Sequence, residues 1–506
     1  MHRPPPAQLQ AASCRGRLPA RSRPAAARGS RPTAAAAAAA GAEVPPELPE
    51  RGQRAAAEEV PKEEAWDYVA PPELLARNRV WADAALRGRT LLAPLTKGGN
   101  LPFRRLCVDF DAELRTMSEM AFARKLVKGD RVENARMYRA PNELCFGVQI
   151  ATNSIAEGLA ASRAAARAGA SWIDLNCGAG AMAGARPGQA QRRRPRPTAA
   201  PGRRAARAGM AGCPIFEATR RGLGAALLRK PTKLARLVAG IAAGSELPVT
   251  VKIRTGESDR KVNAPRVVAL LEQAGAAAVT VHGRTMEQRY KKAADWALIA
   301  SLAAAHPGLA LLGNGDLLTH YEADARRRSG VAGLMVGRGA LIKPWIFEEL
   351  REGRELLLTA AERVGVYRRL AGHMKAHFGD DAWGKRKAFY FFPWHFAFFS
   401  RYRPLPAEVY AADAARHPLI ATRSDLADPR VGESEAELPL LERLLRCEAE
   451  AAHGPIAEAI WDAASDADAV TALEALAASS LAGWEEELRA GGRDGSGRDD
   501  DAAVEG

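Results

Sequence analysis

The stretch Val249–Arg254 reads VTVKIR, and three later stretches repeat its pattern: residues 279–284 (VTVHGR), 311–316 (LLGNGD) and 334–339 (LMVGRG). Each is a short apolar run that ends in polar or glycine residues. Continuous apolar runs predict strands that are covered on both faces, as in a parallel sheet wrapped by helices. Residues 263–275 and 296–306 have helical spacing and are long enough to cross over between parallel strands.

Four earlier runs complete the set, at residues 90–94, 114–120, 145–149 and 172–176. Eight βα units over about 250 residues predict an α/β fold of the (β/α)8 TIM barrel type, over residues 86–350. The active site of such a barrel lies at the carboxyl ends of its strands. A doubly wound open sheet is the alternative, but no G-x-G-x-x-G turn follows the first strand.

The rest of the chain divides by composition. Residues 355–425 predict a smaller α-helical domain, with helices at 361–378 and 385–402, and residues 426–506 predict an acidic, partly helical tail. The aromatics Phe391, Trp394 and Phe396 have helical spacing, which favours core positions over base stacking. No apolar run approaches membrane-spanning length. The six cysteines are scattered without C-x-x-C spacing, which argues against a disulfide framework, a zinc finger or another metal site.

The net charge of +14 is unevenly distributed. Residues 1–65 are rich in Ala, Arg and Pro and predict a disordered segment. Residues 1–42 contain seven arginines and no acid, so they also resemble a transit peptide to a mitochondrion or plastid. Without such a peptide, the cytoplasm or nucleus is expected. The barrel region is also basic, which suits a polyanionic partner, although a solvated basic surface is the alternative.

Two strand ends predict a phosphate site. Residues 314–316 (Asn-Gly-Asp) and 337–338 (Gly-Arg) end the last two strands, where barrels commonly bind phosphate through backbone N–H groups. Ordinary tight turns are the alternative. Lys252, His282 and Gln149 end three other strands. A cation beside a ring that becomes anionic on reduction would be stabilising, so these residues suit a phosphorylated redox cofactor. His282 as a satisfied core histidine is the alternative.

At this point the motifs resemble the tRNA-dihydrouridine synthase family. They are residues 93–95 (APL), 99–105 (GNLPFRR), 147–149 (GVQ), 174–176 (DLN), 212–214 (GCP), 251–256 (VKIRTG) and 282–284 (HGR). Residues 287–290 (EQRY), 294–296 (ADW) and 339–345 (GALIKPW) look like its eukaryotic tRNA-dihydrouridine(47) synthase branch. The likeness covers roughly residues 91–347 and continues weakly to about residue 406.

The resemblance implies an enzyme that binds FMN, uses NADPH as reductant and reduces the C5–C6 bond of a uridine in tRNA. Hydride would pass from reduced FMN to C6, and Cys213 would give a proton to C5. The residues implied at the cofactor are Ala93, Pro94, Leu95, Thr96, Gln149, Lys252, His282, Asn314, Gly315, Asp316, Gly337 and Arg338. Asn176 and Arg254 would face the substrate uracil. The helical domain would bind tRNA, the protein would be a monomer, and messenger RNA is left open as a substrate.

One stretch departs from the family pattern. Residues 179–212 hold eight arginines and no acid, and they separate Asn176-Cys177-Gly178 from Cys213-Pro214. Removing them restores the family spacing Asn-Cys-Gly-Cys-Pro. We interpret the stretch as an insert, either a retained intron or a genuine loop. Two alternatives to the synthase therefore stay open: an FMN barrel enzyme acting on a free pyrimidine, and an RNA-binding homologue in which the insert impairs catalysis.

Overall fold

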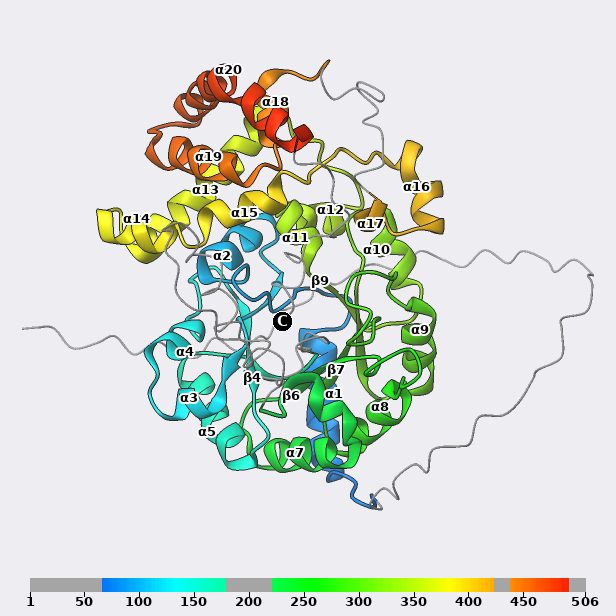
Figure 1. The fold of residues 1–506 in the computed structure, drawn as a ribbon. Coiled ribbons are helices and arrows are strands. Elements are labelled where there is room, and N and C mark those ends of the chain that lie inside the picture. The colour runs from blue at the N-terminus through cyan, green and yellow to red at the C-terminus, as the bar shows by residue number, and fades with distance from the viewer. Residues whose placement is uncertain (1–65, 179–220, 423–436, 491–506) are drawn as a thin grey trace, which may run out of the picture. The chain divides into compact units, whose positions relative to one another are not determined.

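The structure is a computed structural model that describes residues 66–178, 221–422 and 437–490. The predictions for the amino-terminal segment 1–65, for the insert 179–212 and for Cys213 lie outside these residues. Figure 1 shows the fold of the described part.

A closed barrel of eight parallel strands forms the centre of the described chain (Figure 1). The sheet order is β2-β1-β9-β8-β7-β6-β5-β4, the β2–β4 pairing closes the ring, and β3 pairs only with β4 outside it. The predicted TIM barrel is therefore confirmed. The strands are β1 Thr90–Leu92, β2 Arg115–Met117, β3 Ala121–Phe122, β4 Cys145–Ala151, β5 Trp172–Cys177, β6 Val249–Arg254, β7 Ala278–His282, β8 Ala310–Asn314 and β9 Gly333–Val336.

Helices surround the barrel and continue beyond it. Around the barrel lie α1 Pro72–Ala85, α2 Leu101–Phe110, α3 Ala123–Val127, α4 Arg131–Arg136, α5 Ile155–Arg167, the 3-10 helix η1 Gly224–Arg229, α7 Pro231–Gly244, α8 Ala264–Gln273, α9 Trp296–Ala305, α10 His320–Arg327, α11 Arg338–Ile342 and α12 Ile346–Glu352. The carboxy-terminal helices are α13 Ala360–Phe378, α14 Ala382–Ala388, α15 Phe392–Phe399, α16 Ala407–Arg416, α17 Leu419–Thr422, α18 Leu440–Leu445, α19 Glu450–Asp462 and α20 Asp466–Ala490.

Close packing between neighbouring strands explains one glycine of the sequence pattern. Trp172 on β5 is buried, and its indole lies beside Gly147 on β4. A Cβ atom at position 147 would come within 2.2 Å of the Trp172 ring. Since interiors are close-packed, a side chain there would displace the indole. The Gly-Val-Gln motif therefore reflects packing as well as chemistry, and it lies within β4, because the strand continues past the predicted end at Gln149 to Ala151.

The second predicted carboxy-terminal helix, residues 385–402, is wrong as a single element. The structure breaks it into α14, which ends at Ala388, and α15, which begins at Phe392 with Pro393 in its first turn. Proline has no backbone N–H and disfavours helical backbone in the preceding residue, so a helix starts at Pro393 more readily than it passes through. Phe396 is buried, as expected for a core aromatic.

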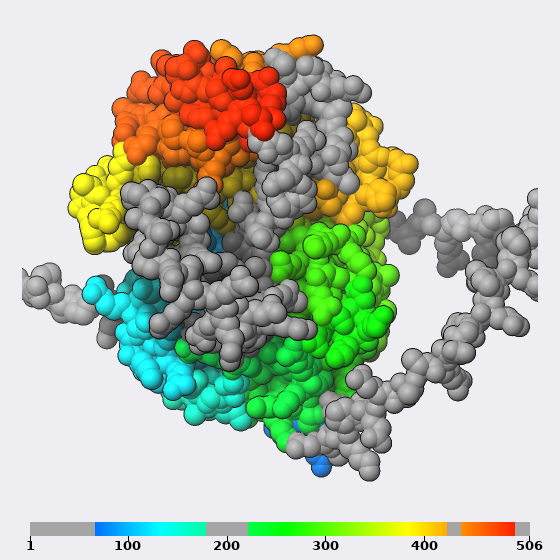
Figure 2. Space-filling view, viewed as in Figure 1, coloured from blue at the N-terminus to red at the C-terminus, as the bar shows by residue number. Residues whose placement is uncertain are grey.

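The helices on either side of residue 425 pack together. Helices α18, α19 and α20 contact α13, and α19 also contacts α15 (Figures 1 and 2). Buried Arg363 on α13 pairs with Glu442 on α18. The helical layer on the barrel therefore includes residues up to 490. Within the described residues, no helix combines the length and apolar character needed to cross a membrane.

A buried ion pair fixes α2 to the barrel. The Glu143 carboxylate accepts from Arg104 Nε at 2.7 Å, from Thr116 Oγ1 at 2.7 Å and from the Ala140 backbone N–H at 2.6 Å. Both charged side chains are at most 2% exposed. Removing one partner of such a pair destabilises the fold, because the other charge stays buried with nothing to compensate its desolvation.

Replacing Glu143 with alanine should therefore lower the free energy of unfolding by about 3–5 kcal/mol, since Arg104 would remain buried without its counterion. The matched control is Glu113→Ala, which removes an exposed ion pair with Arg89 and should cost at most about 1 kcal/mol. Urea unfolding followed by circular dichroism measures both. Similar losses in the two variants would contradict the role of the buried pair.

Candidate functional site

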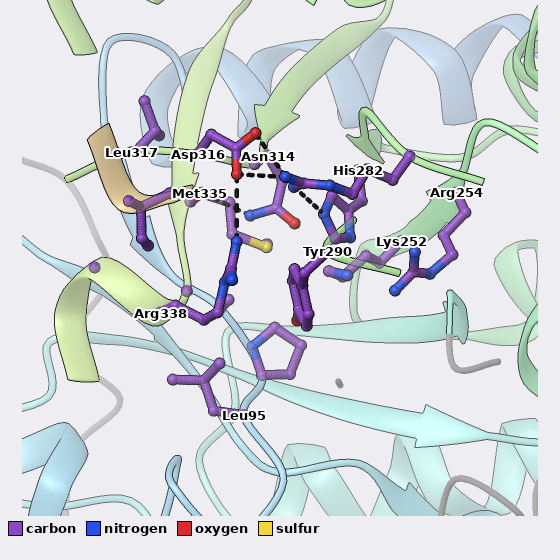
Figure 3. Close-up of a pocket in the computed structure, with 17 residues that line it drawn as sticks. Leu95, Lys252, Arg254, His282, Tyr290, Asn314, Asp316, Leu317, Met335 and Arg338 are labelled. Carbon is purple, nitrogen blue, oxygen red and sulfur yellow. Dashed lines mark hydrogen bonds and ion pairs between the residues drawn. The ribbon is translucent and has the colours of Figure 1, made fainter. Parts of the chain in front are cut away.

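A cavity lies at the carboxyl ends of β1, β6, β7, β8 and β9 (Figure 3). It is lined by most of the site residues predicted from the sequence. They are Ala93, Pro94, Leu95, Lys252, Arg254, His282, Asn314, Gly315, Asp316, Gly337 and Arg338. Residues of the first strand and of the last four thus meet at one place, as a closed parallel barrel requires.

The charged side chains that line this cavity are predominantly basic. Lys252 and Arg254 end β6, Arg284 follows β7 and Arg338 begins α11, while Asp316 is the acidic residue of the lining. All of these side chains are largely buried. Buried charges are tolerated where a partner of opposite charge is present, so this lining suits a ligand that carries negative charge.

The Asp316 carboxylate organises the β8 and β9 side of the cavity. It accepts from Arg284 Nη2 at 2.7 and 2.8 Å, from Arg338 Nη2 at 3.3 Å and from the Ala294 backbone N–H at 2.7 Å (Figure 3). Asp316 has a positive φ of 52°, an uncommon backbone conformation. Its side chain is thus occupied by two guanidinium groups, and a phosphate would meet its backbone rather than its carboxylate.

An aromatic ring covers the Arg338 guanidinium. Arg338 Cζ lies 3.7 Å from the centroid of the Tyr290 ring, and Arg284 Cζ lies 5.5 Å from it. The ring faces the centre of the cavity in Figure 3. A cation over an aromatic face is attracted by the ring quadrupole, which helps to fix both side chains. Tyr290 therefore positions the cation nearest to the predicted phosphate end.

His282 is held in its neutral form. Burial lowers its pKa well below the ordinary value for histidine, and the positive charges of Arg254, Lys252, Arg284 and Arg338 lower it further. Arg284 Nη1 lies 3.4 Å from His282 Nε2. Because a guanidinium can only donate, Nε2 accepts and the proton of the neutral ring lies on Nδ1. His282 thus offers a hydrogen bond rather than a charge.

Gln149 and Asn176 belong to a separate network and do not line the cavity. Asn176 Nδ2 donates to Gln149 Oε1 at 2.8 Å, and Gln149 Nε2 donates to Asp174 Oδ2 at 2.9 Å. Thr250 Oγ1 donates to Asp174 Oδ1 at 2.6 Å. All four side chains are buried. The orientation of both amides is therefore fixed by one carboxylate.

The remaining predicted residues fall outside this cavity or outside the described chain. Thr96 follows the lining residues 93–95 but is not part of the lining. The predicted proton donor Cys213 lies outside the described residues. Cys177, at the end of β5, is buried, and burial followed by the charge of Asp174 raises the pKa of its thiol well above the ordinary value. No group of three His, Cys, Asp or Glu side chains within residues 66–178, 221–422 and 437–490 could hold a metal ion.

The sequence profile of the dihydrouridine synthase family (Dus) matches residues 91–181 and 210–402 of this chain. The chain belongs to the dihydrouridine synthase family. The gap in the match, residues 182–209, falls inside the stretch 179–212 that departs from the family pattern. The matched residues include every strand of the closed barrel except the first residue of β1.

Individual curated relatives agree with this family. Proteins named tRNA-dihydrouridine(47) synthase, with an NAD(P)(+) qualifier, are 36% identical over 371 residues in Cryptococcus neoformans and 34% identical over 361 residues in Coprinopsis cinerea. These matches cover 68% and 67% of this chain. The Homo sapiens protein named as like this synthase is 34% identical over 326 residues, 63% of this chain. The matches span 46%, 48% and 44% of those relatives, which is less than half of their length.

Six lining residues of this Dus barrel were not predicted as site residues: Arg284, Tyr290, Leu317, Met335, Gly339 and Ile420. Arg284 was visible in the His-Gly-Arg motif, and its position after a buried strand is the same signal that identified Lys252. Tyr290 was visible in the Glu-Gln-Arg-Tyr motif. Ile420 comes from α17, beyond the matched residues, and no local pattern connects it to the barrel.

The Asp174 network of this Dus barrel generates a prediction about pH. Burial raises the pKa of Asp174 to about 6, and the donors Thr250 and Gln149 and the charge of Lys252 oppose the rise. A group whose folded pKa is raised stabilises the fold below its unfolded pKa, near 3.9, and loses that contribution as the pH rises through about 6. Acidification from pH 7 to pH 5 should thus favour the native state by about 1 kcal/mol through this group.

The variant Asp174→Asn still accepts from Gln149, offers Thr250 an N–H₂ donor in place of an acceptor, and cannot titrate. The stability difference between wild type and variant should therefore shift by about 1 kcal/mol toward the wild type between pH 7 and pH 5. Urea unfolding at the two pH values measures it, and the contributions of other titrating groups cancel in the difference. A difference that does not change with pH would contradict the raised pKa of Asp174.

Proposed function

We propose that this chain is an FMN-dependent tRNA-dihydrouridine synthase that reduces a uridine of tRNA with NADPH. The observation that carries the proposal is the basic cavity at the carboxyl ends of β6 to β9, with a neutral histidine at its side. Membership of the Dus family and the names of its relatives agree with it.

The residues present fit FMN. The cavity combines convergent polar side chains with an apolar part of its wall, as small-molecule sites do. A Cβ atom on Gly337 would approach only Leu95 and Ala93, at 3.7 and 3.8 Å, so the backbone at the start of α11 is open to a close ligand. Gly337 and Arg338 would hold the phosphate, and Lys252 and His282 would meet the ring system. Reduced FMN, when bound, would supply the hydride for C6 of uridine, with NADPH as reductant.

The chain's own residues would prepare the site for this chemistry. Lys252 would place a positive charge beside a ring that becomes anionic on reduction. His282 would donate one hydrogen bond without adding a further charge, because its ring is neutral. Arg254 donates from Nε to the Gly178 carbonyl at 2.8 Å and from Nη1 to the Thr285 carbonyl at 2.9 Å, which joins the ends of β5 and β7. We assign Arg254 and Asn176 to the uracil side, and Cys213 to the delivery of a proton to C5.

The decisive experiment combines flavin content with product analysis. The purified chain should bind FMN and should form dihydrouridine in tRNA when NADPH is supplied, as measured by mass spectrometry of the digested RNA. Cys213→Ala should retain FMN and lose at least about 100-fold in rate, because general acid catalysis contributes about 10²–10⁴-fold.

Cys177→Ala is the matched control for that experiment. The Cys177 thiol is buried and its pKa is raised, so it should not exchange protons with the substrate, and this variant should keep its activity. Full activity in Cys213→Ala would overturn the assignment of the proton donor. A wild-type protein that binds no flavin would overturn the proposed function itself.

An RNA-facing surface is expected beside the cavity, because a uracil in folded tRNA must be flipped out to reach a barrel interior. Two exposed aromatics lie on α14 and after it, Trp383 and Tyr390, at 62% and 65% exposure. Lys387 lies 5.3 Å from the Trp383 ring, and Lys97, from the loop after β1, lies 4.7 Å from the Tyr390 ring. Figure 2 shows α14, in yellow, at the surface. We assign RNA contact to these aromatic and basic side chains.

Replacing Trp383 and Tyr390 together with alanine should raise the Kd for tRNA about tenfold or more, since base stacking on an aromatic side chain contributes about 1–3 kcal/mol per base. FMN binding should not change. The matched control is Tyr138→Ala, another exposed tyrosine, which lies outside α14 and the turn that follows it. Filter binding at fixed salt measures all three proteins. Equal affinities for wild type and double variant would refute the assignment.

A further inference from the structure

The short helix α17 forms part of the cavity wall although it lies beyond the residues that the family profile matches. The match ends at residue 402, and Ile420 on α17 lines the cavity. Its side chain is 2% exposed. In Figure 3 the amber ribbon of α17 lies next to Leu317, which also lines the cavity. A segment distant from the barrel in sequence thus completes the site.

A single buried carboxylate ties α17 to the loop after β8. Glu322 Oε1 accepts from the Leu419 backbone N–H at 3.0 Å. Its other oxygen accepts from the backbone N–H groups of Leu318 and Thr319, both at 3.1 Å, and from Thr319 Oγ1 at 3.0 Å. Because that loop also carries Asp316, α17 is held at the β8 and β9 end of the cavity, beside the predicted phosphate site.

A second contact fastens the segment that leads to α17. Tyr321, the neighbour of Glu322 on α10, donates from its hydroxyl to the Leu405 carbonyl at 3.1 Å. Helix α16, which follows Leu405, packs on α10. The segment between the helical layer and α17 is therefore anchored at two points on the same barrel helix, which fixes the direction from which Ile420 enters the wall.

We propose that Ile420 is a cofactor-binding residue of this chain and that Glu322 is the residue that positions it. This inference rests on the proposed FMN site. An apolar wall at the phosphate end excludes water, and charge interactions there, such as those of Arg338, are stronger in a medium of low dielectric constant. A wall that is already ordered also removes part of the entropy cost of binding.

The first test is the affinity of the chain, freed of flavin, for FMN. Ile420→Ala should raise the Kd about tenfold, as measured by quenching of flavin fluorescence on titration. Ile420→Val keeps most of the side chain and should stay within about threefold of wild type. The matched control is Ile460→Ala on α19, which removes an equally buried isoleucine that does not line the cavity. It should leave the Kd unchanged.

The second test is a double-mutant cycle with Glu322→Gln, because neighbours that act together give non-additive effects. Glutamine removes one acceptor and directs an N–H₂ group at backbone donors, so α17 should be released and the Kd for FMN should rise. In the Glu322→Gln background, Ile420→Ala should raise log Kd for FMN by less than half as much as it does in the wild type. Thermal unfolding of each flavin-free variant separates this effect from loss of the fold.

The outcomes are distinguishable. If the wild type binds no FMN, the proposed function fails before this inference is tested. If the wild type binds FMN and Ile420→Ala binds within twofold of it, the role of Ile420 is refuted and the proposed function stands. If Ile420→Ala weakens binding equally in both backgrounds, Ile420 contacts the cofactor but Glu322 does not position it. A similar loss in Ile460→Ala would reduce the effect to general destabilisation.

Discussion

The cost of burying charge inside a closed barrel governs this structure. Eight apolar strands and the helices packed around them leave little solvent in the interior, so each charged side chain buried there must find a partner. Asp316 satisfies Arg284 and Arg338, and Glu143 satisfies Arg104. These partners come from different βα units. The same ion pairs that remove the desolvation cost therefore also connect parts of the chain that are distant in sequence.

The cost of burying charge is met by different polar groups on the two sides of the barrel centre. On β4, β5 and β6, one carboxylate, Asp174, orders a chain of amide hydrogen bonds through Gln149 and Asn176. On the side of β7, β8 and β9, Asp316 orders guanidinium groups, and the nearby histidine is neutral because it is buried and cations surround it. The first side holds buried amides whose hydrogen bonds fix one another's orientation. The second side offers positive charge, which suits a phosphate.

The sequence predicted what depends on local pattern. Apolar runs that end in polar residues predicted the strands. Because parallel strands in a closed barrel all end at the same edge, the polar ends of those runs meet there. It predicted most of the cavity lining for the same reason. It missed the break before Phe392, where the helical aromatic pattern concealed the effect of Pro393. It also could not show that Gln149 and Asn176 bind each other, since that pairing depends on the register between neighbouring strands.

Ile420 shows the limit of such inference most clearly. Nothing near residue 420 has the composition of a binding site, and its place in the wall follows from the contacts of Glu322 and Tyr321 on a barrel helix. Those contacts exist only after the barrel and the helical layer have packed. The helical layer also contacts the loop after β1, which carries the lining residue Leu95, because Lys97 of that loop lies over the ring of Tyr390. The cavity is thus bounded by barrel loops that the helical layer itself holds in place, so that packing of that layer and the shape of the cavity depend on the same contacts.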